Sequence, residues 1–322
     1  MMIQKHLAWE SLTQNGDNIV IATHYAPDGD ALGSAFGLAF ALEAIGKKPV
    51  VVLDNFSQKY AFMQGCRFVH DGDPDGLPCD MLVVMDCGSK IRMAHADALF
   101  NRAKLTVSID HHLGNTNFAA HNYVDETASS TCEVVFDIIN QYVPINAAIA
   151  ESLFTGICTD TGGFCYNSTS PKTLEIVIKL MRVGIDFEGI QRRVLYRQTR
   201  AEAAILATAL KYAQFVEGCP IVYSALVPAD LEAVGADYTD LDFTTNYLIN
   251  VEGAAVSALF TLRPSGKVKV SMRSLNTDVS EVAKQFGGGG HKFAAAALFD
   301  GDWEEGKAQV LEALKAAVGK TC

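Results

Sequence analysis

The stretch NIVIATHYAPDGDALGS, residues 18–34, joins an apolar run to a turn that carries two carboxylates. Its first seven residues have the short apolar pattern of a buried strand, and the window 30–45 has the composition of a helix that ends at Gly46. Asp28 and Asp30 flank a glycine between the two elements. The stretch therefore predicts a strand–turn–helix unit with acidic side chains beyond the carboxyl end of the strand.

Apolar, strand-like runs that end on an acid recur through the first half of the chain. MLVVMD closes on Asp86, LTVSID closes on Asp110 with His111 and His112 directly after it, and LFTGICTD closes on Asp160. Because the carboxyl ends of strands gather along one crevice of an open parallel sheet, we expect these acids to lie together. Carboxylates held together need a cation between them. Carboxylate oxygens with imidazole nitrogens favour Mn²⁺, with Mg²⁺ as the alternative.

Strands and helices alternate through residues 1–187. The predicted strands are 18–24, 49–54, 81–86 and 105–110, and the predicted helices are 30–45, 92–102, 130–141, 146–157 and 172–183. Small residues in the first helix would let it lie close against the sheet. The alternation predicts an α/β domain built on a doubly wound, mainly parallel sheet.

A linker and a smaller domain are predicted after this unit. The charged stretch 188–214 is interpreted as a linker helix with Arg193, Arg197 and Arg200 on one face, where a solvated or inter-domain surface is favoured over phosphate contact. Residues 215–322 contain the strand-like runs PIVYSALV, AAVSALFTLR and KVKVSMRS together with helix-like segments. This pattern predicts an α+β domain with a mixed sheet.

Composition and charge narrow the class of protein. The chain has 322 residues, of which 49% are hydrophobic and 20% charged, as in an ordinary globular protein. Its net charge of −11 argues against a protein that holds long duplex nucleic acid, although a substrate with few phosphates can bind locally. Scattered cysteines without a CxxC pair, no signal-peptide pattern and no apolar run of about 18 residues indicate a cytoplasmic protein that does not enter a membrane.

The turn after the first strand is the strongest candidate for metal ligands. An isolated PDGD would more often be a surface turn with Asp30 as a helix N-cap, but His24 and the other strand-end acids favour metal ligation by Asp28 and Asp30. Asp86 ends a buried run and is the predicted bridge between two ions. One of the two histidines after Asp110 is expected to ligate metal while Asp110 orients it, and the other to bind phosphate.

A run of glycines is the second candidate site. The run consists of Gly287, Gly288, Gly289 and Gly290, with His291 directly after it. Such a run exposes backbone N–H groups and allows an anion to approach closely, although on its own it is more often a flexible loop. The spacing is not that of a P-loop. Arg273 and Lys284 nearby favour a binding site for the phosphates of a substrate.

Together these motifs resemble those of the DHH phosphoesterase family, named for the triad that is here Asp110-His111-His112. The order HYAPDGDALGS (24–34), VVMDCGS (83–89), SIDHH (108–112) and GICTDTGGF (156–164) is similar to the four motifs of the family's catalytic domain. The GGGGH run is similar to the signature of the DHH-associated C-terminal domain. The resemblance covers nearly the whole chain and is strongest for the branch of oligoribonucleases and pAp phosphatases.

The resemblance implies a hydrolase with two Mn²⁺ ions. The implied ligands of one ion are His24, Asp28 and Asp86, and those of the other are Asp30, Asp86, His111 and Asp160. His112 would contact the scissile phosphate with Asp110 behind it, and Arg273 with the Gly287–His291 segment would hold another part of the nucleotide.

The implied reaction is hydrolysis of short oligoribonucleotides or of 3′-phosphoadenosine 5′-phosphate (pAp) by a metal-activated water. The second domain would select the substrate, and the family also implies a homodimer. Ala296 stands where the family's loop has a glycine, which leaves fine substrate preference open.

The residues are also compatible with other activities. One alternative is a phosphodiesterase for a cyclic dinucleotide or its linear product pApA, and a less favoured one is an inorganic pyrophosphatase. Another is a non-catalytic nucleotide-binding regulator, which would be expected to have lost metal ligands. A nicotinamide-dependent enzyme is excluded because no GxGxxG opens the helix after the first strand.

Overall fold

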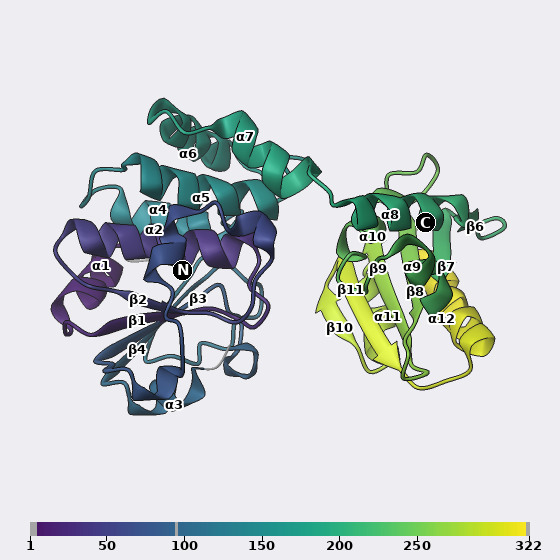
Figure 1. The fold of residues 1–322 in the computed structure, drawn as a ribbon, viewed down its shortest axis with the longest axis horizontal. Helices are drawn as coiled ribbons and strands as arrows, with labels where there is room; N and C mark the ends of the chain where they lie inside the picture. The colour runs from purple at the N-terminus through teal and green to yellow at the C-terminus, as the bar shows by residue number, and fades with distance from the viewer. Residues whose placement is uncertain (1–4, 94–95, 320–322) are drawn as a thin grey trace. The chain divides into compact units, whose positions relative to one another are not determined.

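The computed structural model describes residues 5–93 and 96–319, and the chain divides into two compact units after Arg197. Figure 1 shows that each unit has its own sheet and its own helices. Residues 94 and 95, inside the window 92–102 predicted as a helix, lie outside the described residues.

The first unit is built on a five-stranded sheet in which every described pairing is parallel. In spatial order its strands are β2 (Val50–Val52), β1 (Ile19–Ala22), β3 (Met81–Met85), β4 (Leu105–Asp110) and β5 (His121–Val124). β2 pairs with one side of β1 and β3 pairs with the other, so the strand order reverses between β1 and β3. In sheets of this kind the crevice beyond the carboxyl ends at the reversal is where ligands bind.

Helices cover both faces of this sheet, as the doubly wound prediction requires (Figure 1). The helices on one face are α2 (Gly29–Ala44), α4 (Thr131–Ile139) and α5 (Ala147–Asp160), and α3 (Asp97–Arg102) lies on the other. Alternate strand residues enter opposite cores: Ile21 joins the core that contains Phe36, whereas Val20 joins the core that contains Leu99. The predicted fold class of the first unit is confirmed.

The remaining elements of the first unit are short or peripheral. They are α1 (Lys5–Gln14), α6 (Pro171–Arg182), α7 (Phe187–Gln191) and the 3-10 turns η1 (Gln58–Tyr60), η2 (Gln64–Phe68), η3 (Pro74–Gly76) and η4 (Lys90–Arg92).

The helix predicted at 146–157 is confirmed as α5, whereas the interpretation of the overlapping run that closes on Asp160 as strand-like is wrong. LFTGICTD forms the second half of α5, which Asn146 caps through a hydrogen bond to the Ile149 N–H. The helix is buried on most sides, so its short apolar run cannot be distinguished from a buried strand by pattern alone. Asp160 therefore approaches from the carboxyl end of a helix. The edge strand β5 was not predicted because its HNYV sequence is partly exposed and has no apolar run.

Glycines allow α2 and α5 to cross closely. A Cβ atom at Gly33 would lie 2.5 Å from the Ser152 carbonyl oxygen, and a Cβ atom at Gly156 would lie 2.8 Å from Asp30 Oδ1. The small residues of α2 thus allow close contact with α5. The composition of the helix had predicted only a close approach to the sheet. This crossing brings the carboxyl end of α5 beside the turn that contains Asp28 and Asp30.

The segment 188–214 is not one continuous helix. After α7 the chain forms a single π-helical turn, η5 (Arg192–Tyr196), and then an extended backbone at Arg197 before α8 (Arg200–Lys211) begins. Because the helix is interrupted at Arg197, the predicted shared helical face of Arg193, Arg197 and Arg200 does not exist.

The second unit contains a six-stranded mixed sheet. In spatial order its strands are β10 (Gly289–His291), β11 (Ala294–Phe299), β9 (Val268–Ser274), β8 (Val256–Leu262), β7 (Ile221–Leu226) and β6 (Gln214–Phe215). β7 and β8 pair in parallel, and the other described pairs are antiparallel. The helices are α8, α9 (Pro228–Val234), α10 (Asp242–Leu248), α11 (Val279–Gln285) and α12 (Trp303–Val318). The predicted α+β class with a mixed sheet is confirmed.

The α2–α5 crossing gives a test of packing. Alanine is a better helix former than glycine by about 1 kcal/mol, but overpacking costs about 1–3 kcal/mol, and a backbone carbonyl cannot rotate away. We expect Gly33→Ala to lower the free energy of unfolding by at least about 1 kcal/mol, measured by urea denaturation. Gly76→Ala is the control, because a Cβ atom there meets nothing within 4 Å. Equal stability of the two variants would contradict the packing argument.

Candidate metal centre

The first group of candidate ligands follows β1 and β3. His24 Nε2 lies 3.6 Å from Asp86 Oδ2, and ligand atoms of His24, Asp28 and Asp86 lie within 4.8 Å of one another. His24 Nδ1 donates to the Tyr25 carbonyl oxygen at 2.8 Å, since a carbonyl can only accept. Nε2 is therefore the ring nitrogen that faces the carboxylates, and in the neutral ring its lone pair would be available to a metal ion, as in a metal-ligating histidine.

The second group surrounds His111. Its Nε2 atom lies 3.2 Å from Asp160 Oδ2, 3.8 Å from Asp86 Oδ1 and 3.9 Å from Asp30 Oδ2. Its Nδ1 atom donates to the Ala128 carbonyl oxygen at 3.3 Å, so Nε2 is the ring nitrogen that faces the acids. Residues from β3, the end of α5 and the start of α2 therefore meet at one imidazole.

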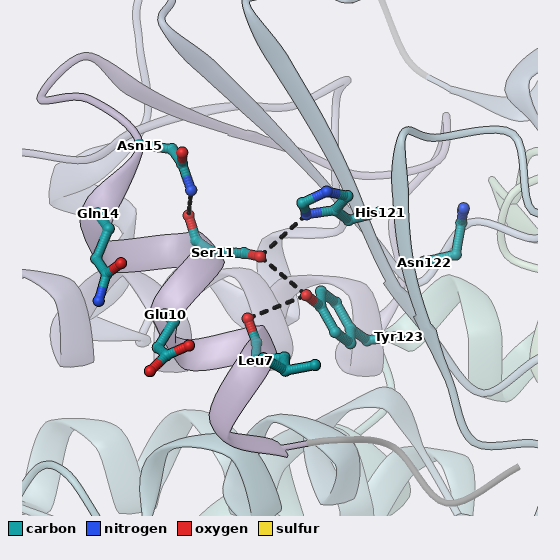
Figure 2. A pocket seen from close by; sticks show the side chains of 8 residues that line it. All are labelled: Leu7, Glu10, Ser11, Gln14, Asn15, His121, Asn122 and Tyr123. Atoms are coloured by element: carbon teal, nitrogen blue, oxygen red, sulfur yellow. Dashed lines mark hydrogen bonds between the residues drawn. The ribbon is translucent and has the colours of Figure 1, made fainter.

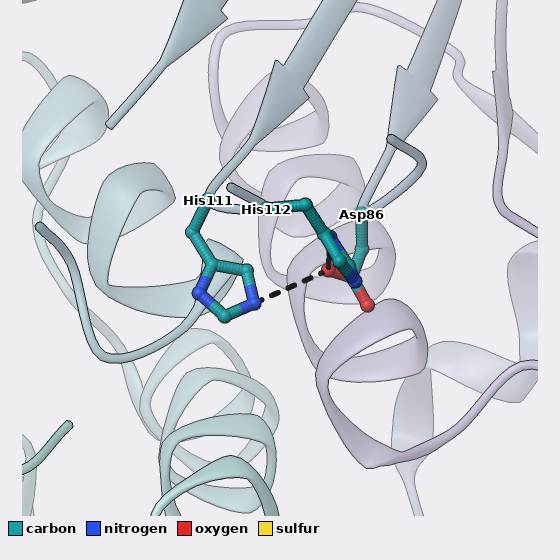
Figure 3. Close-up of side chains that lie close together, drawn as sticks. All are labelled: Asp86, His111 and His112. Atoms are coloured by element: carbon teal, nitrogen blue, oxygen red, sulfur yellow. Dashed lines mark ion pairs between the residues drawn. The ribbon is translucent and has the colours of Figure 1, made fainter. Parts of the chain in front are cut away.

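Asp86 belongs to both groups, and Figure 3 shows its carboxylate beside the rings of His111 and His112. Its two carboxylate oxygens face different histidines, because Oδ2 lies toward His24 and Oδ1 toward His111. Its backbone φ of +53° is in the left-handed region, which a non-glycine residue adopts at a cost of about 1–3 kcal/mol. Such strain is maintained where a side chain must point in a particular direction for function.

Asp30 is fully buried and is held by the amino end of α4. The backbone N–H of Thr131 donates to Asp30 Oδ2 at 2.6 Å, and that of Cys132 donates to Oδ1 at 2.9 Å. Thr131 also donates from Oγ1 to Asp86 Oδ1 at 2.9 Å, so one residue positions two of the acids. A helix amino terminus is a favourable site for a carboxylate because its first N–H groups have no partners within the helix.

Sequence reasoning missed Thr131, although a signal was present. Ser130 and Glu133 have the spacing of a capping box, which marks the start of a helix and hence a cluster of available N–H groups. The Ser130 side chain accepts from the Glu133 N–H in the structure.

Asp28 has a structural role at the same turn. It is the N-cap of α2, where its Oδ1 accepts from the N–H groups of Asp30 and Ala31. The alternative in which Asp30 is the N-cap is therefore wrong. The hydroxyl of buried Tyr60, which sequence reasoning also missed, accepts from the Gly29 N–H, and burial with the charge of Asp28 raises the Tyr60 pKa.

Asp110 orients His112 rather than His111. Asp110 Oδ1 accepts from His112 Nδ1 at 2.7 Å, and Asn115 donates to Asp110 Oδ2 at 2.6 Å. Burial lowers the pKa of His112, but the Asp110 hydrogen bond and the charge of Asp86 outweigh it and raise that pKa to about 9. His112 is thus an imidazolium at neutral pH, fixed at the edge of the acidic cluster.

The acids carry more negative charge than the histidines balance. Burial and the neighbouring charge of Asp86 raise the pKa of Asp30 to about 7. Burial and the charges of Asp30 and Asp86 raise the pKa of Asp160 well above its ordinary value. Burial also opposes ionisation of Asp86, but His24, His112 and His111 outweigh it and hold its pKa low. Divalent cations would remove this conflict, and the carboxylate and imidazole donors fit them. The residues present therefore fit a centre for divalent metal ions.

The predicted substrate residues lie in the second unit. The strand register places His291 opposite Ala294 and Ala294 opposite Arg273, so the three positions lie side by side across β10, β11 and β9. Arg273 donates from Nε to Asn246 Oδ1 at 2.9 Å and from Nη1 to the Met272 carbonyl oxygen at 3.0 Å. The side chain of His291 lies outside the described residues.

The second half of the glycine run, Gly289 and Gly290, begins the edge strand β10, whereas Gly287 lies in the turn before it. Gly289 and Gly290 pair with Ala296 and Ala295 in β11. A Cβ atom at Gly288 would lie 2.1 Å from the Ala296 carbonyl oxygen, so glycine is required there by close backbone contact.

A hollow of about 450 Å³ lies between α1 and β5, away from these acids (Figure 2). Ser11 Oγ lies 3.0 Å from His121 Nδ1 and 2.9 Å from Tyr123 Oη, and Tyr123 Oη donates to the Leu7 carbonyl oxygen at 3.0 Å. These contacts join the first helix to the edge of the sheet and give His121 a structural role.

Comparisons with known proteins agree with this geometry. Residues 18–157 match the DHH family, N-terminal domain, and residues 220–320 match the DHHA1 domain. The bifunctional oligoribonuclease and PAP phosphatase NrnA of Thermus thermophilus is 33% identical over 300 residues, which cover 92% of this chain and 89% of that protein. The cyclic-di-AMP phosphodiesterase GdpP of Geobacillus thermodenitrificans is 26% identical over 95% of this chain and 48% of that protein.

A solved structure has the same fold over nearly the whole chain. The crystal structure of an exopolyphosphatase-related protein from Bacteroides fragilis matches with a TM-score of 0.90 at 25% identity, and the match covers 98% of this chain and 96% of that one. The chain belongs to the DHH family. DHH phosphoesterases are metal-dependent, in agreement with the acidic and histidine clusters described above. No helix in residues 5–93 or 96–319 is long and apolar enough to cross a membrane.

The raised pKa of His112 predicts a pH dependence of stability in the metal-free protein. The folded pKa of about 9 exceeds the unfolded value of about 6.5, so the stabilisation is complete below pH 6.5 and is lost as pH rises through 9. We expect His112 to contribute a fall of about 2–3 kcal/mol in the free energy of unfolding in EDTA across that window, and the total fall to be smaller in His112→Gln, where the raised pKa of His24 still contributes. His70→Gln, outside the cluster, is the control. A fall of the same size in His112→Gln would overturn the assignment.

Proposed function

We propose that this protein is a metal-dependent phosphoesterase that hydrolyses short oligoribonucleotides and pAp. The observation that carries the proposal is His111 Nε2 within 3.9 Å of carboxylate oxygens from three different elements. The 33% identity to an oligoribonuclease and PAP phosphatase over most of both chains supports the choice of substrate.

Two Mn²⁺ ions are the proposed cofactors, with Mg²⁺ as the alternative. His24, Asp28 and Asp86 would hold one ion, and Asp30, Asp86, His111 and Asp160 would hold the other. Divalent ions at such a centre supply Lewis-acid stabilisation of phosphoryl oxygens and lower the pKa of water. The shared position of Asp86, with its two oxygens directed at different histidines, supports its proposed role as the bridge.

His112 is the proposed contact to the scissile phosphate. Because Nδ1 is bound to Asp110, His112 would donate from Nε2 where negative charge develops on the phosphate oxygens. Asp110 and Asn115 fix the plane of the ring, which reduces the reorganisation needed when substrate binds. The Thr131 N–H and hydroxyl groups hold Asp30 and Asp86 in place.

Arg273 and the Gly287–His291 segment are the proposed contacts to another part of the nucleotide. The strand register places Arg273 beside His291, and Asn246 holds the guanidinium through Nε. A guanidinium matches the geometry of a phosphate, and strand-edge N–H groups can add donors to the same anion.

Hydrolysis of a cyclic dinucleotide or of pApA is the second candidate. It rests on the 26% identity to GdpP, of which this chain spans about half. A cytoplasmic location and a homodimer formed through the first unit complete the proposal.

A time course of hydrolysis tests the choice of substrate. The purified protein with Mn²⁺ would be given 5′-labelled RNAs of two to about 24 nucleotides, pAp and pApA, with His111→Ala as the inactive control. We expect rapid loss of the shortest RNAs and phosphate release from pAp, both at least about 100-fold slower in the variant. Strong preference for pApA would favour the second candidate. Turnover of none of them by a metal-loaded protein would overturn the proposal.

Calorimetric titration with Mn²⁺ tests the proposed bridge. We expect two bound ions for the unaltered protein and at least about 100-fold weaker binding of both for Asp86→Ala, since one carboxylate serves both positions. Asp71→Ala removes an exposed acid elsewhere in the first unit and is the matched control. Retention of both ions by Asp86→Ala would contradict the shared role.

A further inference from the structure

Three arginines and a tyrosine line a hollow of about 670 Å³ at the end of the first unit. The lining residues are Gly189, Arg192, Arg193, Tyr196 and Arg197. All three arginines are exposed, and the Tyr196 side chain is 65% exposed. A positive surface of this kind is unexpected in a chain with a net charge of −11.

The π-helical turn η5 creates this surface. The Arg197 N–H donates to the Arg192 carbonyl oxygen at 2.7 Å, which closes a turn five residues apart. The wider turn places residues four and five apart on one side, so Arg192 shares its side with Tyr196 and Arg197. π turns are rare and are frequent at functional sites.

Two residues of the hollow lie close to segments that lead to the candidate metal centre. A Cβ atom at Gly163 would lie 4.0 Å from Tyr196 Oη, and Gly163 is three residues after Asp160. Three residues of chain span at most about 11 Å. The Arg193 guanidinium lies 5.0 Å from the centre of the Phe62 ring, and Phe62 is close in sequence to Tyr60, which contacts the Gly29 N–H.

The acids near the hollow leave its arginines available. Arg192 pairs with Glu188 at 3.2 Å, but both side chains are more than 70% exposed, and such pairs contribute little. The charge of Arg193 lowers the pKa of the Glu151 carboxyl, but burial outweighs this effect and raises that pKa. A phosphate can therefore replace Glu188 at small cost.

We propose that this hollow binds the part of a single-stranded oligonucleotide that extends beyond the scissile phosphate. Arg192, Arg193 and Arg197 contact successive phosphates of the strand, and a base stacks on the Tyr196 ring. The inference rests on the proposed function, because it takes a nucleic acid strand as the ligand of the adjacent centre. The hollow would favour longer ligands, because pAp is too short to occupy both the metal centre and the hollow.

Binding measured without hydrolysis tests this inference. The full chain in EDTA would be titrated against a fluorescein-labelled RNA of five nucleotides at several salt concentrations, with fluorescence anisotropy as the signal. Removal of two phosphate contacts in Arg192→Gln/Arg197→Gln should reduce the slope of log K against log salt by about 1.4. Lys48→Gln/Arg182→Gln removes two exposed charges elsewhere in the same unit and should leave the slope unchanged. Equal slopes for the two double variants would overturn the inference.

Substitution of Tyr196 tests the stacked base. We expect Tyr196→Ala to weaken binding of the same RNA about tenfold and Tyr196→Phe, which keeps the ring, to bind within about twofold of the unaltered protein. Equal affinity of Tyr196→Ala and the unaltered protein would overturn the stacking contact.

A kinetic arm separates the failure of this inference from failure of the proposed function. With Mn²⁺ present, Arg192→Gln/Arg197→Gln should lower the ratio of kcat/KM for the RNA to kcat/KM for pAp about tenfold. An active protein with an unchanged ratio would overturn only the hollow as a strand site. An inactive protein that still shows the salt-slope difference would overturn the proposed function and retain the strand site.

Discussion

The rest of the first unit depends on the hydrogen bonds from the amino end of α4 to the Asp30 carboxylate. Asp30 has no exposure to solvent, so its charge must be compensated inside the protein. The N–H groups of Thr131 and Cys132 supply that compensation and fix the amino end of α4 against the turn after β1. The glycine at position 156 leaves room for the same carboxylate under α5. Three helices are thus positioned around one acid, and the approach of Asp86, His111 and Asp160 follows from their arrangement.

The acidic cluster that would bind metal ions destabilises the folded protein when no ion is bound. Buried carboxylates near Asp86 raise one another's pKa, and Asp86 itself is held at positive φ. Hydrophobic residues at these positions would remove the repulsion between the buried charges, but they would also remove the donors that a divalent cation requires. The surrounding core offsets the cost, since the strands at the sheet centre and the helices α2 and α5 are buried almost throughout. A metal ion would convert the repulsion between the acids into attraction to a common charge.

Most of the fold and of the acidic cluster could be predicted because the signals are local. Asp86 and Asp110 end apolar runs, and parallel strands bring such ends to one edge. Asp160 could be placed in the cluster, but its run of eight residues was given two interpretations, as a buried strand and as part of the helix predicted at 146–157, and the pattern alone could not choose between them. The role of Thr131 depends on a contact between segments far apart in sequence. The choice of His112 and Asn115 as the partners of Asp110 depends on side-chain orientation within one loop. No pattern along the chain encodes those distances. The π turn at 192–196 was likewise hidden, because its sequence is that of an ordinary charged helix.

The separation of the hydrophobic cores has a consequence for how this protein can change in evolution. The cores around Phe36 and Val20 lie in the first unit, whereas those around Val270 and Leu259 lie in the second, and no buried residue is shared between the two sets. Substitutions in separate cores have nearly additive effects on stability. Mutations that reshape the second unit therefore need no compensating mutation around the acidic cluster. Selection can therefore change the second unit while the acidic cluster of the first unit is inherited unchanged.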